Sequence, residues 1–166
     1  SANHFGKISP TTAEHVLEDF NNSVPVLDGG PCPIGLESTI IDLSQPQAAI
    51  RRYGAITEEE LVPIVGPLGT SNTVAPGTLQ AHYAPSTSLL LSASVSEDAE
   101  QLREQGLSVA VLSIDDPVDY AKSLYAELRR MDKLKVDILI AKKPNSIGIG
   151  KALLDRLNKA SFGSIL

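Results

Sequence analysis

Between residues 86 and 166, short apolar runs alternate with segments of helical period, and this alternation constrains the fold more than any other feature. The apolar runs lie at 88–93, 108–114 and 136–141. The helical patterns that follow them lie at 95–105, 118–131 and 147–160. Strand–helix repeats of this length join parallel strands through right-handed crossovers. This part of the sequence therefore predicts a small, three-layer, Rossmann-like α/β domain with a parallel sheet.

Residues 1–62 show a different, mixed pattern. A 3.6-residue apolar stripe predicts a short helix at 12–20, and Thr57 with Glu60 has the spacing of a capping box that begins another helix. Extended, partly alternating runs predict strands at 24–27, 36–43 and 48–52. We interpret this part as α/β with hairpin-type neighbours.

The charged residues divide the chain into three segments. Residues 1–62 hold three Lys or Arg and nine Asp or Glu, whereas residues 86–166 hold eleven of each sign. Residues 63–85 hold no charged side chain and are rich in Pro, Gly, Ser and Thr. Because a connection this long is usually functional or disordered, we interpret it as a linker, and we expect it to act as a lid that closes over a ligand.

The first twelve residues place hydroxyl groups and an amide around Gly6 and continue directly into a predicted helix. Ser9 is expected to be the N-cap and Pro10 the first helical residue, which would make the helix mouth an anion-binding cradle. The alternative is an ordinary helix cap without a ligand. Because Ser1 opens the chain in the middle of this motif, we expect the chain to be a fragment.

Two polar positions in the predicted strands suit a small ligand. Ser38 lies at the start of a predicted strand, where a hydroxyl group can bind a ligand, although a surface serine in a strand is the alternative. Arg51 and Arg52 are the only adjacent basic pair in an acidic segment, and arginine suits phosphate recognition. Since neighbours on a strand point to opposite faces, only one of them can face a common pocket. A solvated arginine remains the alternative.

Several separated motifs occur in the same order as in a known family. They are SAN at 1–3, SPTT at 9–12, LDGG at 27–30, GLEST at 35–39, Arg52 before GAI at 54–56, PG at 76–77, HYAP at 82–85, GIG at 148–150 and DRL at 155–157. Together they resemble the Sua5/YrdC/YciO family in its long Sua5 form, without the N-terminal half of the YrdC domain. The resemblance implies three parts: residues 1–62 as the C-terminal part of a YrdC-like domain, 63–85 as the linker, and 86–166 as the Sua5 C-terminal domain.

The resemblance also implies an activity. The family makes L-threonylcarbamoyladenylate from ATP, L-threonine and bicarbonate or CO2, releasing pyrophosphate, and the product feeds the t6A modification of tRNA. By resemblance, the ATP-binding residues are Ser1, Asn3, Ser9, Arg52, His82 and Tyr83. Ser38 is expected to bind threonine, and Mg2+ is expected to accompany ATP. No catalytic residue is assigned, because such a displacement needs positioning and charge neutralisation more than a protein nucleophile.

Composition narrows the environment and the partners. No apolar run approaches the roughly 20 residues of a membrane-spanning helix, so we expect a cytoplasmic protein with no membrane partner. The single cysteine, Cys32, has no partner spacing for zinc, and no protein metal site is expected. The net charge of −6 argues against a broad nucleic-acid surface. Residues 122–159 are locally basic, which leaves direct tRNA binding open beside a merely solvated face.

Three functional interpretations therefore compete. The first is part of a threonylcarbamoyl-adenylate synthase. The second is a non-catalytic module that contacts tRNA or proteins of the tRNA modification pathway. The third is an inert truncation.

The first prediction is that the 166-residue chain does not turn over by itself. The family carries further lysine and arginine side chains that are not found in this sequence, so a transferred phosphate would have too few cations around it. The chain should release no pyrophosphate when incubated with ATP, L-threonine, bicarbonate and Mg2+. Clear, threonine-dependent release would contradict the prediction.

Overall fold

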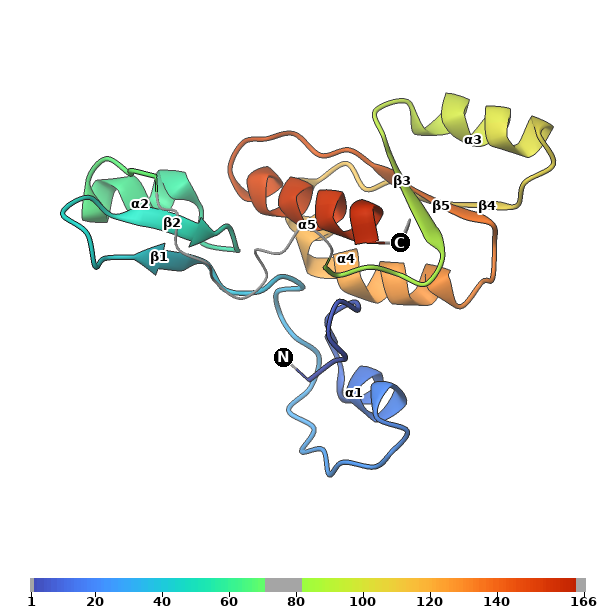
Figure 1. Cartoon of the computed structure of the whole chain (residues 1–166), viewed down its shortest axis with the longest axis horizontal. Helices are drawn as coiled ribbons and strands as arrows, with labels where there is room; N and C mark the ends of the chain where they lie inside the picture. Colours follow the sequence, from blue (N-terminus) through green and yellow to red (C-terminus); the bar gives the residue numbers. More distant parts are fainter. Residues whose placement is uncertain (1, 71–81, 164–166) are drawn as a thin grey trace.

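The computed structural model describes residues 2–70 and 82–163, and these residues form an α/β protein (Figure 1). Its helices and strands follow in the order α1 (Ala13–Asp19), β1 (Ile40–Asp42), β2 (Ala49–Arg52), α2 (Glu58–Val65), β3 (Ser88–Ser92), α3 (Val95–Glu104), β4 (Val109–Leu112), α4 (Pro117–Asp132), β5 (Ile138–Lys142) and α5 (Ile149–Gly163). None of the helices in these two ranges has the length and apolar character needed to cross a membrane.

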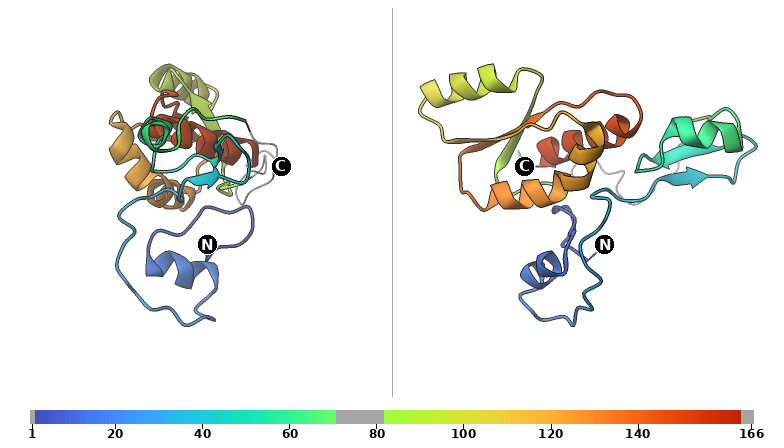
Figure 2. Two further views of the ribbon diagram at one scale, coloured as in Figure 1. Left: turned by 90° about the vertical axis from the view of Figure 1, so that its left-hand side faces the viewer. Right: turned by 180° about the vertical axis from the view of Figure 1, so that it is seen from behind.

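The predicted parallel sheet is confirmed, and its strands lie in the order β3-β5-β4. Helices α4 and α5 cover one face and α3 covers the other, so the domain has three layers (Figures 1 and 2). Successive side chains of the central strand β5 point to opposite faces of the sheet. Leu139 therefore packs with α4 and α5, while Ile140 packs with Val95 and Ala99 of α3. A strand that is buried on both faces reads as a continuous apolar run, as β5 does.

Side-chain caps begin two of the predicted helices, and one of these caps was predicted from the sequence. Thr57 and Glu60 form a reciprocal capping box at α2, as the sequence predicted. At α4, Asp116 accepts hydrogen bonds from the backbone of Val118 and Asp119, and Pro117 occupies the first turn. Both helices therefore begin where unpaired backbone N–H groups are satisfied.

The helix-mouth prediction for the first segment is wrong. Thr12, not Ser9, is the N-cap of α1 and accepts a hydrogen bond from His15 N, so Pro10 lies outside the helix. The Ser9 hydroxyl instead donates to Glu37 at 2.7 Å. Both Ser9 and Thr12 are residue types that suit an N-cap. Ser9 does not cap the helix because its hydroxyl group is bound to the distant carboxylate of Glu37.

Two strand predictions also need correction. Residues 24–27 form no strand, and Leu27 is 98% exposed. The run at 36–43 shortens to β1, which pairs antiparallel with β2. An extended segment becomes a β-strand only where a neighbouring strand pairs with it through backbone hydrogen bonds. Among the described residues, no strand pairs with residues 24–27 or 36–39.

The N-terminal segment shares its core with the C-terminal sheet and helices. Ile8 and Leu36 are buried in the same apolar cluster as Leu124 and Leu128 of α4. Gly35 lies directly against α4, because a Cβ there would be 2.3 Å from the carbonyl oxygen of Lys122. Helix α4 therefore supports both parts of the chain, while the β1–β2 hairpin and α2 lie together at one end of the molecule (Figure 1).

The proposed linker is only partly irregular. Its first residues complete α2, and Gly69 N donates to Ala48 O at 2.8 Å. Residues 63–65 are therefore part of a helix and not of the linker. At the far end, Tyr83 and Ala84 are buried, and Ala84 forms a parallel bridge with Lys7. The middle of the expected lid, residues 71–81, lies outside the described residues.

The contact of Gly35 with α4 gives the second prediction. Gly35→Ala should lower the free energy of unfolding by about 1–3 kcal/mol, because the new methyl group would meet two backbone carbonyls that cannot rotate away. Gly29→Ala is the matched control, since its Cβ would meet no atom within 4 Å. Urea denaturation of both variants measures the difference. Equal stabilities would mean that α4 and the 33–36 segment are not packed as described.

Candidate functional site

A cavity of about 560 Å3 lies between the residues before α1, the loop that leads into β1, the end of β2, and α4. Its walls combine polar side chains with an apolar floor. The lining residues are Ala2, Ser9, Pro10, Thr11, Cys32, Ile34, Gly35, Leu36, Glu37, Ser38, Ile40, Arg52 and Tyr125. Three of the expected site residues, Ser9, Ser38 and Arg52, therefore share one cavity.

Ser38 and Arg52 form one wall of this cavity. The Arg52 guanidinium donates from Nε to the Ser38 carbonyl oxygen at 3.0 Å and from Nη2 to Ser38 Oγ at 3.1 Å. Arg51 points to the other face of β2, where it lies 3.9 Å from a carboxylate oxygen of Asp42 and its side chain is only 6% exposed. The opposite orientation of the two arginines is as the strand geometry predicted.

Glu37 lies beside Ser38 and collects several hydrogen bonds. Its carboxylate accepts from Ser9 Oγ at 2.7 Å, from Tyr125 OH at 2.9 and 3.0 Å, and from Arg156 Nε at 2.8 Å. Burial by itself would raise the pKa of Glu37, but the Arg156 charge and the hydrogen bonds from Arg156 and Ser9 lower the pKa below its ordinary value. Glu37 is therefore a half-buried, charged anchor in the wall of the cavity.

Arg156 of α5 is the cationic partner of Glu37, and its side chain is fully buried. Nη2 donates to the Tyr53 carbonyl oxygen at 2.8 Å, and Nη1 donates to Asp155 at 2.5 Å. The guanidinium carbon lies 5.1 Å from the centre of the Tyr83 ring. Tyr83 has a positive φ of 62° and stacks on Tyr125, so it lies behind Glu37 rather than in the lining of the cavity.

A second buried arginine fixes the loop that carries Ser9. Arg129 of α4 makes a bidentate pair with Asp19 at 2.6 and 2.8 Å and donates to the carbonyl oxygens of Ile8 and Ser9. Guanidinium geometry suits such a planar set of acceptors. The position of Ser9 at the cavity is thus held by α4.

The other expected ATP-binding residues lie outside this lining. Ser1 lies outside the described residues. Asn3 donates to the Lys7 carbonyl oxygen at 3.0 Å, and its buried Oδ1 has no hydrogen-bond partner among residues 2–70 and 82–163. The His82 ring lies 4.1 Å from the Tyr83 ring with the two planes tilted by 55°. Burial lowers the pKa of His82, and its Nδ1 likewise lacks a partner within those ranges. Their proposed role in ATP binding stays a prediction.

Sequence reasoning missed Glu37, Tyr125, Arg129 and Arg156 as parts of the site. Glu37 carried a signal, because it is the single acidic residue inside the 35–39 motif. Arg156 carried one too, because it lies in the DRL motif at 155–157, but no role in the site was predicted for it, for Tyr125 or for Arg129. Their role depends on contacts with residues about 90 to 120 positions away in sequence, which no local pattern shows.

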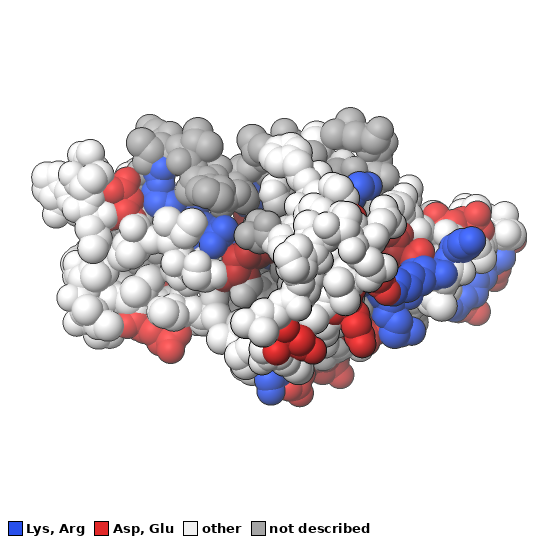
Figure 3. Space-filling model, turned by 90° about the horizontal axis from the view of Figure 1, so that it is seen from below, with Lys and Arg blue, Asp and Glu red and all other residues white. Residues whose placement is uncertain are grey.

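The basic stretch at 122–159 is largely neutralised by acidic neighbours. Ion pairs join Arg130 to Glu127, Lys133 to Glu18, Lys142 to Asp115, Lys151 to Glu58 and Lys159 to Asp155. Figure 3 shows basic and acidic side chains next to each other on one face of the molecule. Paired charges have less capacity to neutralise phosphates than free ones.

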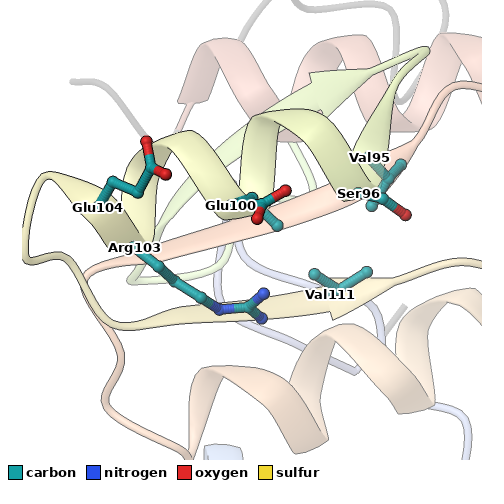
Figure 4. A pocket seen from close by; sticks show the side chains of 7 residues that line it. Val95, Ser96, Glu100, Arg103, Glu104 and Val111 are labelled. Atoms are coloured by element: carbon teal, nitrogen blue, oxygen red, sulfur yellow. The ribbon is translucent and has the colours of Figure 1, made fainter.

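A second hollow, of about 620 Å3, lies between α3 and the edge strand β4. Figure 4 shows Arg103 reaching from α3 toward β4, near Val111, while Glu104 points away. The hollow contains none of the motif residues. In the part of the chain that the structure describes, no group of three or more His, Cys, Asp or Glu could hold a metal ion.

The fold and the first cavity define the class: an α/β protein whose hydroxyl- and guanidinium-lined pocket is supported by helices of a second segment. Residues 47–161 match the family described as threonylcarbamoyl-AMP synthase, C-terminal domain. Residues 1–54 match the Sua5–YciO–YrdC family, described as telomere recombination. The chain belongs to the Sua5 family, as its motifs predicted.

The relatives and a solved structure agree with this assignment. The threonylcarbamoyl-AMP synthase of Bacillus subtilis is 34% identical over 197 aligned residues, covering 100% of this chain and 57% of the relative. That of Pyrococcus abyssi is 35% identical over 191, covering 97% and 56%. The crystal structure of P. abyssi Sua5 complexed with L-threonine matches with a TM-score of 0.86 and 34% identity, covering 99% and 57%. The chain thus spans little more than half of these relatives.

The third prediction separates the two adjacent arginines. Arg52→Ala should weaken ATP binding by about 1.5–3 kcal/mol, the range for a charge-assisted hydrogen bond, because Arg52 faces the cavity. Arg51→Ala should leave ATP affinity near wild type, although it removes the partner of Asp42. Calorimetric titration of the two variants with ATP measures both affinities. Equal losses of affinity would contradict the assignment of the two faces.

Proposed function

We propose that this chain forms the threonine-binding wall, and part of the phosphate-binding wall, of an L-threonylcarbamoyladenylate synthase. The observation that supports the proposal is the Ser38–Arg52 wall of the cavity. It occurs in a chain whose relatives are named threonylcarbamoyl-AMP synthase and whose solved relative is complexed with L-threonine. In this proposal, the enzyme acts in t6A formation in tRNA.

The residues of the cavity suit the charges of this reaction. Bicarbonate or CO2 and the amine of threonine give a carbamate, whose carboxylate oxygen attacks the α-phosphorus of ATP while pyrophosphate leaves. The planar guanidinium of Arg52 matches a carboxylate or a phosphate, and the Ser38 hydroxyl can bind a carboxylate or hydroxyl group of threonine. These residues bind and orient the reactants, and no protein nucleophile is needed.

Other parts of the proposal concern groups beyond this cavity. Mg2+ would come with the triphosphate and neutralise its charge. Because the described residues contain no cluster of acidic or histidine ligands, no residue of this chain is assigned to the metal. Asn3, Ser9, His82 and Tyr83 are proposed on the nucleotide side. The product would pass to tRNA modification proteins in the cytoplasm.

A titration with L-threonine tests the proposal on this chain and gives the fourth prediction. Saturable NMR shifts should appear at residues 35–39 and at Arg52, because these residues line the cavity. Ser38→Ala should weaken the affinity by about 0.5–1.5 kcal/mol, the net value of one hydrogen bond.

Ser44→Ala is the matched control for Ser38→Ala. The Ser44 hydroxyl donates to Asp42 and is not part of the cavity lining, so its removal should leave the affinity unchanged. Shifts that do not saturate, or equal effects of the two serine variants, would contradict threonine binding in this cavity.

A further inference from the structure

A single guanidinium group joins four separate parts of the chain. Arg156, on α5, donates to Glu37 before β1 and to the Tyr53 carbonyl oxygen after β2. It also lies 5.1 Å from the centre of the Tyr83 ring, at the end of the 63–85 segment. It also pairs with Asp155, its own neighbour on α5.

The two acceptors of Arg156 are the chain neighbours of the two wall residues. Glu37 directly precedes Ser38, and Tyr53 directly follows Arg52. The two segments also lie in close contact, because a Cβ on Gly54 would be 2.5 Å from the Glu37 carbonyl oxygen. Arg156 is not in the lining of the cavity. It therefore holds the Glu37–Ser38 and Arg52–Tyr53 pairs from behind the wall.

Because Arg156 is buried, its hydrogen bonds to Glu37 and Tyr53 need good geometry. Arg156 is 0% exposed, and a buried charge is tolerated only when its partners have good geometry. A guanidinium can donate in one plane to Glu37 and Tyr53 at 2.8 Å each, whereas a lysine ammonium is a single point charge. The Glu37 carboxylate is in turn fixed by Ser9 and Tyr125. A small displacement of Arg156 would therefore be transmitted to both wall segments.

We propose that Arg156 is a positioning residue, through which the C-terminal α/β domain sets the distance between Ser38 and Arg52 in the ligand cavity. The domain then has a defined part in ligand binding: through Arg156, which is not in the lining of the cavity, it fixes the wall. The identity of the ligand rests on the proposed function, but the positioning role does not, because it concerns the ligand-free chain.

The test compares Arg156→Met, Arg156→Lys and Glu37→Gln with wild type by NMR without ligand. The readouts are the Ser38 amide signal and the Arg52 Nε–H signal in every variant, and the pKa of the Glu37 carboxyl group in the variants that retain Glu37. Lys159→Met is the matched control, because Lys159 lies one turn further along α5 and pairs with Asp155 but not with Glu37. Thermal unfolding first establishes that each variant is folded.

Arg156→Met should raise the pKa of Glu37 by about 1–3 units, because the opposite charge is lost, and should displace both wall signals. Arg156→Lys should keep most of the low pKa and still displace the Arg52 signal, because one ammonium cannot serve Glu37 and Tyr53 together. Glu37→Gln, which retains the arginine, should displace Ser38 more than Arg52. The control should leave all three readouts at wild-type values.

Two results would overturn the proposal. One is a folded Arg156→Lys or Arg156→Met variant whose Ser38 and Arg52 signals stay at wild-type positions, which would make Arg156 a core residue only. The other is an equal displacement by Lys159→Met. If Arg156→Met does not fold, Arg156→Lys gives the same decision.

L-Threonine titrations separate this inference from the proposed function. Arg156→Lys should lower the affinity for L-threonine by roughly tenfold, the low end for a group that orients a binding residue. A wild-type chain that fails to bind L-threonine, while Arg156→Lys displaces the wall signals, would contradict the proposed function and support the positioning role. Unchanged wall signals together with normal threonine binding would contradict the positioning role alone.

Discussion

The ion pair between half-buried Glu37 and fully buried Arg156 is the interaction on which the site depends. Removing two charges from water is costly, so the pair is stable only because Ser9, Tyr125 and the Tyr53 carbonyl oxygen complete its hydrogen bonds. The folded pKa of Glu37 is lowered, so the contribution of the pair to stability is present above the unfolded pKa and is lost as the pH falls through the folded value. Since the partners come from both halves of the chain, the cavity and the C-terminal domain form one structural unit.

Helix α4 has a corresponding role for the apolar core. One face packs on the parallel sheet through residues such as Leu124 and Leu128, while its backbone lies directly against Gly35 and its Arg129 holds the loop around Ser9. The same helix thus supports a sheet made from residues 88–142 and a loop made from residues 8–36. This shared support explains how the loops at the cavity are held in place although they contain little regular structure.

Much of the fold could be predicted from local patterns. The three strands and three helices of the C-terminal domain appear within a few residues of their expected bounds, because each has a clear period and an identifiable cap or turn. The capping box at Thr57 and the opposite faces of Arg51 and Arg52 were also correct. The short strand expected at 24–27 was not, since strand formation requires a neighbour that sequence alone does not provide.

For the site, the sequence by itself determined the motifs, and hence the family and the residue types available for binding: Ser9, Ser38 and Arg52. Only the tertiary structure decided that Ser9 donates to Glu37 instead of capping α1. The structure also decided that Arg156, about 120 residues away, holds the wall of the cavity. The reason is physical: caps and periods depend on residues within one or two turns, whereas a buried charge is satisfied by whichever groups the complete fold brings within hydrogen-bonding distance.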